Sequence, residues 1–506
     1  MNQEVTTEHQ PLKGGALALG ALGLATANFL AILDTTVANV SVSNIAGGLG
    51  TSTSQGTYVI TSYAVAEAIS VPLTGWLSAR FGAIRVFVTC LIAFGIFSAL
   101  CGLSSSMMML VTFRVFLGLC GGPLMPLSQT LMIRVFPKDK AHAAIGLWSM
   151  TTLIAPIMGP ILGGTLCDQF SWPYIFYFNL PFAVTAGLVC WGLLQRFENK
   201  TIKTPIDKVG LLLLIVWVGA LQIMLDEGKD HDWFASTQIV VLAVIAAIGF
   251  LSFLIWELTE KNPVINLKIF RHRGYTASMM TLALGFGSFF GTTVLTPLWL
   301  QIYMGYTATI AGYATATMGI LAVFLAPVIA NLANKYDPRW FVCGGLLWLG
   351  CWTLIRSFNT LDMSFGQISL QMFWQGIGMP LFFVPLTALA LSSVARHEID
   401  SAAGLMNFIR SLAGAFATSM VNTSWEDTSR YVHAELAGLT DRSHQVLAAM
   451  LNHGVNLSHI RSTLEHMLQS QSVMIATNQI FMEIAALFAL SAMIIWIAPR
   501  VKTSAS

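Results

Sequence analysis

Three charged side chains lie inside long apolar stretches of this sequence. Asp34 lies near the end of an apolar run that begins at about Gly14, Glu67 lies about twelve residues into the next apolar segment, and Arg114 lies in a later one. An ionised side chain inside hydrocarbon costs about 2.5 kcal/mol or more, so it needs a partner or a function. A carboxylate beside an arginine stays ionised, whereas a carboxyl held alone in a dry environment takes up a proton. Asp34, Glu67 and Arg114 are therefore predicted to couple conformational change to protonation.

The depth of two of these charges along their predicted helices is similar. Asp34 lies about eight residues, or about 12 Å, below the outer end of a helix that ends near Val42. Arg114 reaches a similar depth in a helix that runs inward from about Met107. We therefore predict that Asp34 and Arg114 meet. The alternatives are a permanent structural ion pair for these two residues, and a neutral, hydrogen-bonded carboxyl in a helix contact for Glu67.

The elements that must position these charges are membrane-spanning helices. Of the 506 residues, 55% are hydrophobic and 10% are charged, against about 25% charged residues in a soluble domain. The formal net charge of +2 gives no reason to expect a nucleic-acid partner. Fourteen apolar segments are long enough to cross the bilayer as helices. They lie at 15–42, 55–78, 86–104, 107–134, 140–167, 173–195, 209–226, 235–257, 275–303, 307–332, 340–356, 367–394, 398–425 and 473–498.

The basic residues fix the direction of these segments. Of the 26 Lys and Arg residues, nineteen lie in segments that are cytoplasmic if both termini are cytoplasmic. Two more, Arg114 and Arg410, lie inside helices. The outer segments hold the remaining five, which are Lys229, Arg356, Arg430, Arg442 and Arg461. This asymmetry satisfies the positive-inside rule and predicts cytoplasmic N- and C-termini.

Residues 427–470 form the one large polar segment on the predicted outer side. This segment carries five of the ten histidines, His433, His444, His453, His459 and His466. A metal site or a pH sensor would use histidines, but their spacing is not that of a tight ligand set, so we predict a solvated helical hairpin and no metal site.

Two stretches of the chain resemble one another. The sequence that begins at Pro72 reads PLTGWLSARFGAIR, and the one that begins at Pro327 reads PVIANLANKYDPR. Both leave an apolar segment through small residues and enter a short basic loop. Repeated halves are typical of transporters whose substrate site lies between the halves.

Several motifs identify a family. Residues 75–85 (GWLSARFGAIR) resemble the loop motif between helices 2 and 3 of the major facilitator superfamily, and residues 110–122 (LVTFRVFLGLCGG) resemble its helix 4 motif. Residues 146–164 (GLWSMTTLIAPIMGPILGG) are similar to the helix 5 motif of antiporters. Further stretches resemble motifs of the fourteen-helix drug:proton antiporter-2 family, close to its EmrB/QacA branch. They are LDTTVANV (33–40), LQIMLDEGKDHDWF (221–234), NPVINLKIF (262–270) and NFIRSLAGA (407–415).

The resemblance implies a major facilitator fold: two six-helix bundles with two extra helices between them. The expected division is a cytoplasmic tail (1–14), an N-terminal bundle (15–195), a linker (196–208), two additional helices (209–257), a second linker (258–274), a C-terminal bundle (275–498) and a short tail (499–506). The sequence departs from the family pattern at four positions. Ala79 replaces the acidic residue of the loop motif, Ser43 a proline, Ala155 a glycine, and Gln375 a frequent arginine.

The motifs also give candidate site residues. The cytoplasmic loop gate would use Gly75, Arg80, Gly82 and Arg85. The glycines and prolines of the antiporter motif allow close helix packing and kinking, and they are Gly146, Pro156, Gly159, Pro160, Gly163 and Gly164. Candidates for lining an apolar substrate cavity are Tyr63, Phe286, Phe290, Tyr303, Trp374, Gln375, Phe383, Asn407 and Arg410. In the C-terminal half, Arg410 and Glu483 are predicted to form a polar pair.

These features predict a proton-coupled multidrug antiporter that exports hydrophobic or amphipathic compounds by alternating access in the bacterial cytoplasmic (inner) membrane. It would need no cofactor because the proton gradient drives it. The EmrB-like resemblance implies a periplasmic adaptor (a membrane fusion protein) and, through it, an outer-membrane channel as partners in a tripartite pump. An exporter dedicated to one metabolite, such as a fatty acid, siderophore or antibiotic, is the alternative, and a transport-inactive receptor or assembly subunit is a third. The sequence contains no phosphate-binding G-x-x-x-x-G-K-[ST] loop, and its predicted cytosolic segments contain no nucleophile and base pair or metal-ligand cluster, which disfavours an ATP-driven pump or an enzyme.

Overall fold

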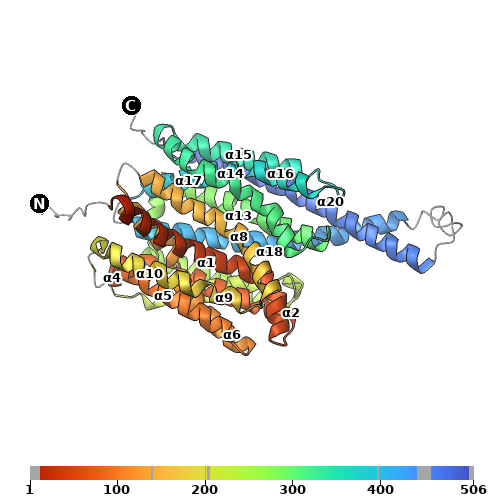
Figure 1. The fold of residues 1–506 in the computed structure, drawn as a ribbon, viewed down its shortest axis with the longest axis horizontal. Helices are drawn as coiled ribbons and strands as arrows, with labels where there is room; N and C mark the ends of the chain where they lie inside the picture. Colours follow the sequence, from red (N-terminus) through yellow and green to blue (C-terminus); the bar gives the residue numbers. More distant parts are fainter. Residues whose placement is uncertain are drawn as a thin grey trace, which may run out of the picture.

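The computed structural model describes residues 12–137, 141–199, 201, 205–261, 263–395, 398–440 and 457–500. All regular structure in these ranges is helical (Figure 1), which confirms the predicted all-α class. The predicted tails 1–14 and 499–506 and the residues His444 and His453 lie wholly or mostly outside the described ranges.

The N-terminal half folds around its own apolar core, which runs from Leu12 to Phe197. Its long helices are interrupted where prolines stand, at Pro72, Pro123 and Pro173, because proline lacks the N–H that continues a helix. The elements are α1 (Gly14–Gly48), α2 (Thr53–Gly56), α3 (Tyr58–Ser70), α4 (Thr74–Phe81), α5 (Ala83–Gly102), α6 (Met107–Gly121), α7 (Leu124–Val135), α8 (Ala141–Gln169), α9 (Tyr174–Tyr177), α10 (Asn179–Leu194) and η2 (Gln195–Phe197).

The C-terminal half surrounds a second core. Its elements are η4 (Leu267–Arg271), α13 (Arg273–Ile302), α14 (Ala308–Lys335), α15 (Pro338–Arg356), α16 (Phe365–Gln375), α17 (Gly378–Ser392), α18 (Ile399–Thr440), α20 (Leu457–Ile494) and η6 (Ile495–Ile497). Figure 1 shows that α1 begins and α20 ends at the same end of the molecule.

A helical pair joins the two halves in the sequence. It consists of α11 (Lys208–Glu227) and α12 (Thr237–Thr259), with the short η3 (Trp233–Ala235) between them. Trp217 of α11 packs its ring on Phe253 of α12 and on Phe408 of α18, each with 6.0 Å between ring centroids. The pair therefore shares the apolar core of the C-terminal half, and α11 also packs against α3.

Ten helices in the described ranges are long and apolar enough to cross a membrane, and the count is 11 if the bent α8 is one span. Three of the fourteen predicted segments do not meet these criteria. The segment 55–78 is divided among α2, α3 and α4, α15 carries arginines at both ends, and α18 has a polar outer third. The all-helical membrane architecture is thus confirmed, and the number fourteen stays a prediction.

The ends of α18 and α20 project beyond the other helices as a hairpin (Figure 1). The two helices have 42 and 38 residues, well beyond the roughly 20 that cross a bilayer. His433 of α18 bonds Glu465 of α20 at 3.0 Å in this projecting part. The described parts of 427–470 thus have the predicted helical form.

Candidate functional site

Asp34 and Arg114 form a buried ion pair between α1 and α6, as their depths predict. The second carboxylate oxygen of Asp34 accepts a hydrogen bond from Asn179 Nδ2 at 3.2 Å, and Asn179 also donates to Ser98 Oγ at 3.0 Å. Asp34 is 4% exposed and Arg114 is fully buried. Both carboxylate oxygens therefore have donors, and these donors favour the charged form of Asp34.

Tyr63 belongs to this cluster and not to an open cavity. Its ring lies under the Arg114 guanidinium, with 4.5 Å from Cζ to the ring centroid, and its side chain is fully buried. Arg114 Nε donates to Val59 O at 2.9 Å, while its Nη2 is buried without a hydrogen-bond partner. The prediction that Tyr63 lines a substrate cavity is therefore not met in this conformation, because Arg114 covers the ring.

Glu67 is the second buried carboxyl, one turn after Tyr63 on α3. It is 8% exposed, and its Oε1 is buried without a hydrogen-bond partner. Glu67 and Arg410 of α18 attract each other across the interface between the halves. Depth along the predicted helices does not indicate a partner for Glu67, because the position of Arg410 depends on how α18 faces α3.

Arg410 lies at the centre of the interface, not beside Glu483. Its guanidinium lies 5.6 Å from the ring of Trp148 on α8 and 5.7 Å from that of Phe286 on α13, and its Nη2 contacts Met125 Sδ of α7. Glu483 is on the exposed face of α20 and bonds Gln479. The predicted pair of Arg410 and Glu483 is not formed, because similar depth did not reveal that the two side chains face opposite directions.

The helix that carries the antiporter motif, α8, touches both halves. A Cβ on Gly146 would lie 3.1 Å from Cβ of Ala330 on α14, and one on Gly163 would lie 3.3 Å from Val37 on α1. Gly159 packs on Thr36 of α1, Gly164 is buried, and Pro160 lies within the same helix. These glycines allow the close approach that the sequence predicts.

An ion pair ties the halves together beside the basic loops. Arg134 of α7 bonds Asp400 of α18 at 2.5 Å, and Ser78 Oγ of α4 donates to the same carboxylate at 3.3 Å. A Cβ on Gly75 would lie 3.2 Å from Cα of Ser401. The loop motif has no acidic residue at Ala79, and the carboxylate beside this loop is that of Asp400 from the opposite half. The loop motif alone does not reveal this carboxylate.

The rest of the loop motif supports the start of α5. Gly82 has φ 97°, a conformation that favours glycine, and the carboxylate of Glu198 accepts the N–H groups of Ile84 and Arg85 at 3.0 Å each. Asn199 Oδ1 accepts the N–H of Ala83 at 2.7 Å. Arg80 lies over the rings of Trp76 and Phe81, at 5.6 and 5.8 Å, and Arg85 is exposed. Gly82 thus has a structural role in the turn, and Glu198 escaped the sequence analysis.

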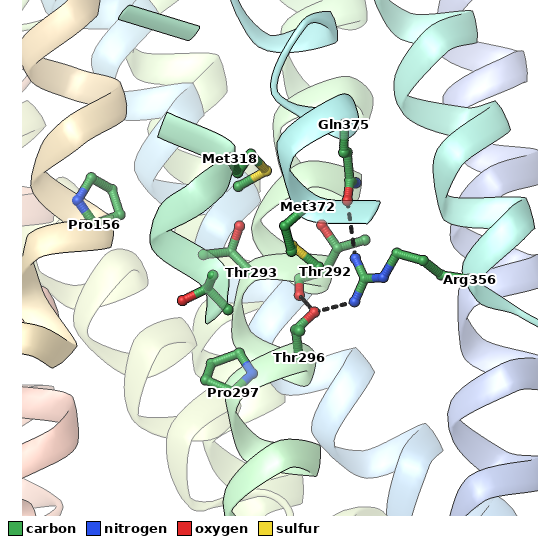
Figure 2. Close-up of a pocket in the computed structure, with 10 residues that line it drawn as sticks. Pro156, Thr292, Thr293, Thr296, Pro297, Met318, Arg356, Met372 and Gln375 are labelled. Atoms are coloured by element: carbon green, nitrogen blue, oxygen red, sulfur yellow. Dashed lines mark hydrogen bonds between the residues drawn. The ribbon is translucent and has the colours of Figure 1, made fainter. Parts of the chain in front are cut away.

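A cavity of about 30 Å³ lies between α8 and the C-terminal half (Figure 2). Its lining residues are Pro156, Thr292, Thr293, Thr296, Pro297, Thr315, Met318, Arg356, Met372 and Gln375. Gln375 is the predicted cavity candidate that lines it. Arg356, expected in an outer loop, is the last residue of α15 and is 2% exposed. The predicted membrane segment 340–356 ends at Arg356, so the sequence places this residue at the membrane surface and does not indicate that it is buried.

The other cavity candidates lie elsewhere. Three belong to an aromatic cluster beside Arg410, in which the Phe286 ring lies 5.6 Å from that of Phe290 and 5.7 Å from that of Phe383. Tyr303 packs on Trp425 at 5.8 Å. Trp374 is 41% exposed and faces outward, because α16 turns its neighbour Gln375 inward.

Asn407 lies at the interface between the halves and not at the cavity. Its Nδ2 donates to Gln129 Oε1 of α7 at 3.2 Å and to Ala403 O at 2.8 Å. This bond joins α18 to α7 one turn before Arg410.

Residues 24–418 match the model of the Major Facilitator Superfamily. The chain is 41% identical over 495 residues to the fatty acid resistance protein FarB of Neisseria gonorrhoeae, covering 97% of this chain and 98% of that protein. It is 40% identical over 496 residues to the multidrug export protein EmrB of Escherichia coli K12, covering 97% of each chain.

Solved structures support the fold independently of close sequence similarity. The structure of the human organic anion transporter MFSD10 aligns with a TM-score of 0.58 at 14% identity, covering 96% of this chain and 100% of that one. The proton:xylose symporter XylE aligns with a TM-score of 0.59 at 13% identity, covering 96% and 97%. At these identities the likeness shows the fold alone. Together with the family match, it shows that this chain is a multi-pass membrane protein of the major facilitator superfamily, in the group that contains EmrB and FarB.

Proposed function

We propose that this protein is a proton-coupled exporter of hydrophobic and amphipathic compounds in the cytoplasmic membrane of a bacterium. The observation that carries the proposal is the pair of buried carboxyl groups beside the interface between the halves. Asp34 has donors on both oxygens, whereas Glu67 has a buried oxygen without one. Two carboxyls with unequal partners are suited to hold a proton on one group while the other stays charged.

The proton cycle follows from where these groups lie. Arg410 of the opposite half attracts the carboxylate of Glu67, so a movement that separates α18 from α3 would weaken that attraction. A carboxylate left alone in a dry site takes up a proton, and the return of the arginine releases it. The close contact of α8 with α1 and α14 resists leakage of protons while the halves move.

The cargo is proposed from the relatives and the apolar interface. EmrB is named as a multidrug export protein and FarB as a fatty acid resistance protein. A cluster of phenylalanines beside Arg410 offers lipophilic surface without strict shape selection. A dedicated exporter is the second candidate, and the similarity to FarB favours a fatty acid over a siderophore or an antibiotic as its cargo.

The helical hairpin of α18 and α20 is the proposed docking surface for a periplasmic adaptor, which would connect the exporter to an outer-membrane channel. The hairpin extends beyond the bundle, and its two helices bond each other through His433 and Glu465.

Proton release from proteoliposomes tests the coupling. A lipophilic dye added to the purified protein should cause proton release in the parent, and Asp34→Asn or Glu67→Gln should lower it at least tenfold. Glu483→Gln is the matched control, because Glu483 also lies in a membrane helix but faces outward. Dye-driven proton release that stays at the parental level in both Asp34→Asn and Glu67→Gln would refute the proposed coupling.

A further inference from the structure

Arg356 is a buried cation with no carboxylate partner among the residues that the structure describes. Four arginines are buried in the part of the chain that the structure describes. Arg114 pairs with Asp34, Arg339 pairs with Asp337, and Arg410 is attracted by Glu67. Arg356 forms no ion pair with any described residue.

Neutral partners hold Arg356 in place. Its Nη1 donates to Gln375 Oε1 at 3.1 Å and its Nη2 donates to Thr296 Oγ1 (Figure 2). Its Cζ lies 4.1 Å from the ring centroid of Phe481. Gln375 is held in turn, because its Nε2 donates to Thr353 Oγ1 at 3.3 Å. Burying an unpaired cation costs several kcal/mol, so a site that keeps one without a counter-ion is suited to receive an anion.

The cavity places this cation where a substrate can reach it. Arg356, Thr296 and Gln375 all line the cavity, together with Pro156 of the opposite half. Three more threonines line it, and their hydroxyls can rotate to donate to an anion. Methionine and proline side chains form the rest of the wall, so a polar end and an apolar end lie side by side. At about 30 Å³ the cavity in this conformation is large enough only for water. A larger ligand therefore requires the halves to move apart.

We propose that Arg356, Thr296 and Gln375 bind the carboxylate group of amphipathic anionic substrates. This proposal rests on the proposed function, since it assigns a substrate class to the same exporter. The planar guanidinium presents two parallel N–H groups that match a carboxylate, and the neutral Gln375 and Thr296 yield these donors more readily than a protein carboxylate would. The apolar chain of the substrate lies toward Met318, Met372 and the face of α8.

Binding of dodecanoate and dodecanol to the purified protein in phosphatidylcholine nanodiscs tests the site. Gln375→Glu is the decisive variant, because it adds a carboxylate of nearly the same shape 3.1 Å from Arg356 and occupies the guanidinium. Dodecanoate binding should weaken at least tenfold in Gln375→Glu and in Arg356→Gln, while dodecanol binding changes less than twofold. Arg430→Gln, at an exposed arginine on the outer part of α18, should leave both affinities unchanged.

Two outcomes would overturn the proposal. Parental dodecanoate affinity in folded Gln375→Glu would show that Arg356 does not bind the carboxylate. Loss of the difference in dodecanoate binding between the parent and Arg356→Gln, when net-anionic phosphatidylglycerol replaces net-neutral phosphatidylcholine, would assign the site to an anionic lipid headgroup instead. Proton release driven by a cationic dye separates this test from the proposed function. A Gln375→Glu protein that keeps dye-driven proton release but loses dodecanoate binding supports both the proton-coupled export and the carboxylate site. Absence of dye-driven proton release in the parent refutes the proposed proton-coupled export.

Discussion

At the scale of single residues, the buried ion pair of Asp34 and Arg114 combines stability and function. Removing one member of a buried pair leaves the other charge without a partner and costs about 3–5 kcal/mol, whereas replacing both is far milder. The geometry fits this case, because Arg114 is fully buried and its Nη2 already lacks a hydrogen bond.

We therefore expect Asp34→Asn to lower the thermal unfolding midpoint in detergent more than the double variant Asp34→Asn with Arg114→Gln does. Neither protein should couple dye export to proton release. Thermal unfolding by tryptophan fluorescence measures the first effect. A double variant less stable than Asp34→Asn would mean that Asp34 is not the main stabilising partner of Arg114.

Sequence reasoning succeeded for this pair and failed for two other arginines. Asp34 and Arg114 were matched because depth along two helices of opposite direction is readable from the chain. The partner of Arg410 depends on which way α18 is rotated, and the burial of Arg356 depends on how α16 and α20 cover the end of α15. The rotation of a helix about its axis and the packing of other helices over its end are tertiary properties, and a hydropathy pattern does not reveal them.

At the scale of elements, an ion pair joins the halves beside the basic loops. Asp400 lies in the first turn of α18 and pairs with Arg134 of the other half, and we expect this pair to hold a cytoplasmic gate in place of the acidic residue absent at Ala79. A partly exposed ion pair contributes about 0.2–1 kcal/mol, so its loss should shift the equilibrium between closed and open gate about 1.4- to fivefold.

Labelling of a cysteine at Ala330 measures this shift, since Ala330 is buried against Gly146 at the same end but does not contact Asp400. In a background without the native cysteines, Asp400→Asn should raise the rate of maleimide labelling from the cytoplasmic side about 1.4- to fivefold. Adding Ala79→Asp should restore the slow rate. Asp362→Asn, in an exposed turn, is the control. Equal rates in the parent and in Asp400→Asn would show that the pair does not hold the gate.

The close approach of α8 to α1 gives a second prediction for the elements. Gly159→Ala places a Cβ against Thr36, 3.1 Å from the carbonyl carbon of that residue, and overpacking of this kind costs about 1–3 kcal/mol. Gly192→Ala on α10 is the control, because a Cβ there meets nothing within 4 Å and improves helix propensity. Thermal unfolding should therefore show a lower midpoint for Gly159→Ala and an unchanged or higher one for Gly192→Ala.

The loop after α11 is held to α18 by a pH-dependent contact. Lys229 bonds Glu426 at 2.5 Å and, with Arg430, holds the pKa of Glu426 below its ordinary 4.5. Because the folded-state pKa is the lower one, the pair stabilises the contact above about pH 4.5, and the stabilisation is lost as the pH falls through the folded-state value. Hydrogen exchange in residues 228–236 should accelerate in acid relative to the intrinsic rate. In Glu426→Gln the relative acceleration should be absent, and an acceleration equal to that of the parent would exclude this pair as its cause.

At the scale of the whole molecule, two apolar cores meet where α8 packs against α14 and where α7 packs against α18. The sequence predicted the membrane helices and their family from composition and motifs. It did not predict that α11 and α12 share the core of the C-terminal half, because Trp217, Phe253 and Phe408 meet only in the folded chain. The helix count depends on hydropathy, which the polar outer part of α18 lowers although the helix is continuous.

The projecting hairpin of α18 and α20 is expected to serve docking of the adaptor and not transport. The core of the C-terminal half includes Trp425 and Val473, and none of its members lies among the described residues between them. Replacing residues 430–467 by a short Gly-Ser linker should therefore leave the thermal midpoint nearly unchanged and dye-driven proton release within twofold of the parent. Co-purification of the periplasmic adaptor should be lost, because its proposed docking helices are gone. Unchanged recovery of the adaptor would locate docking on another surface, whereas loss of proton release would show that the hairpin helps to move the two halves.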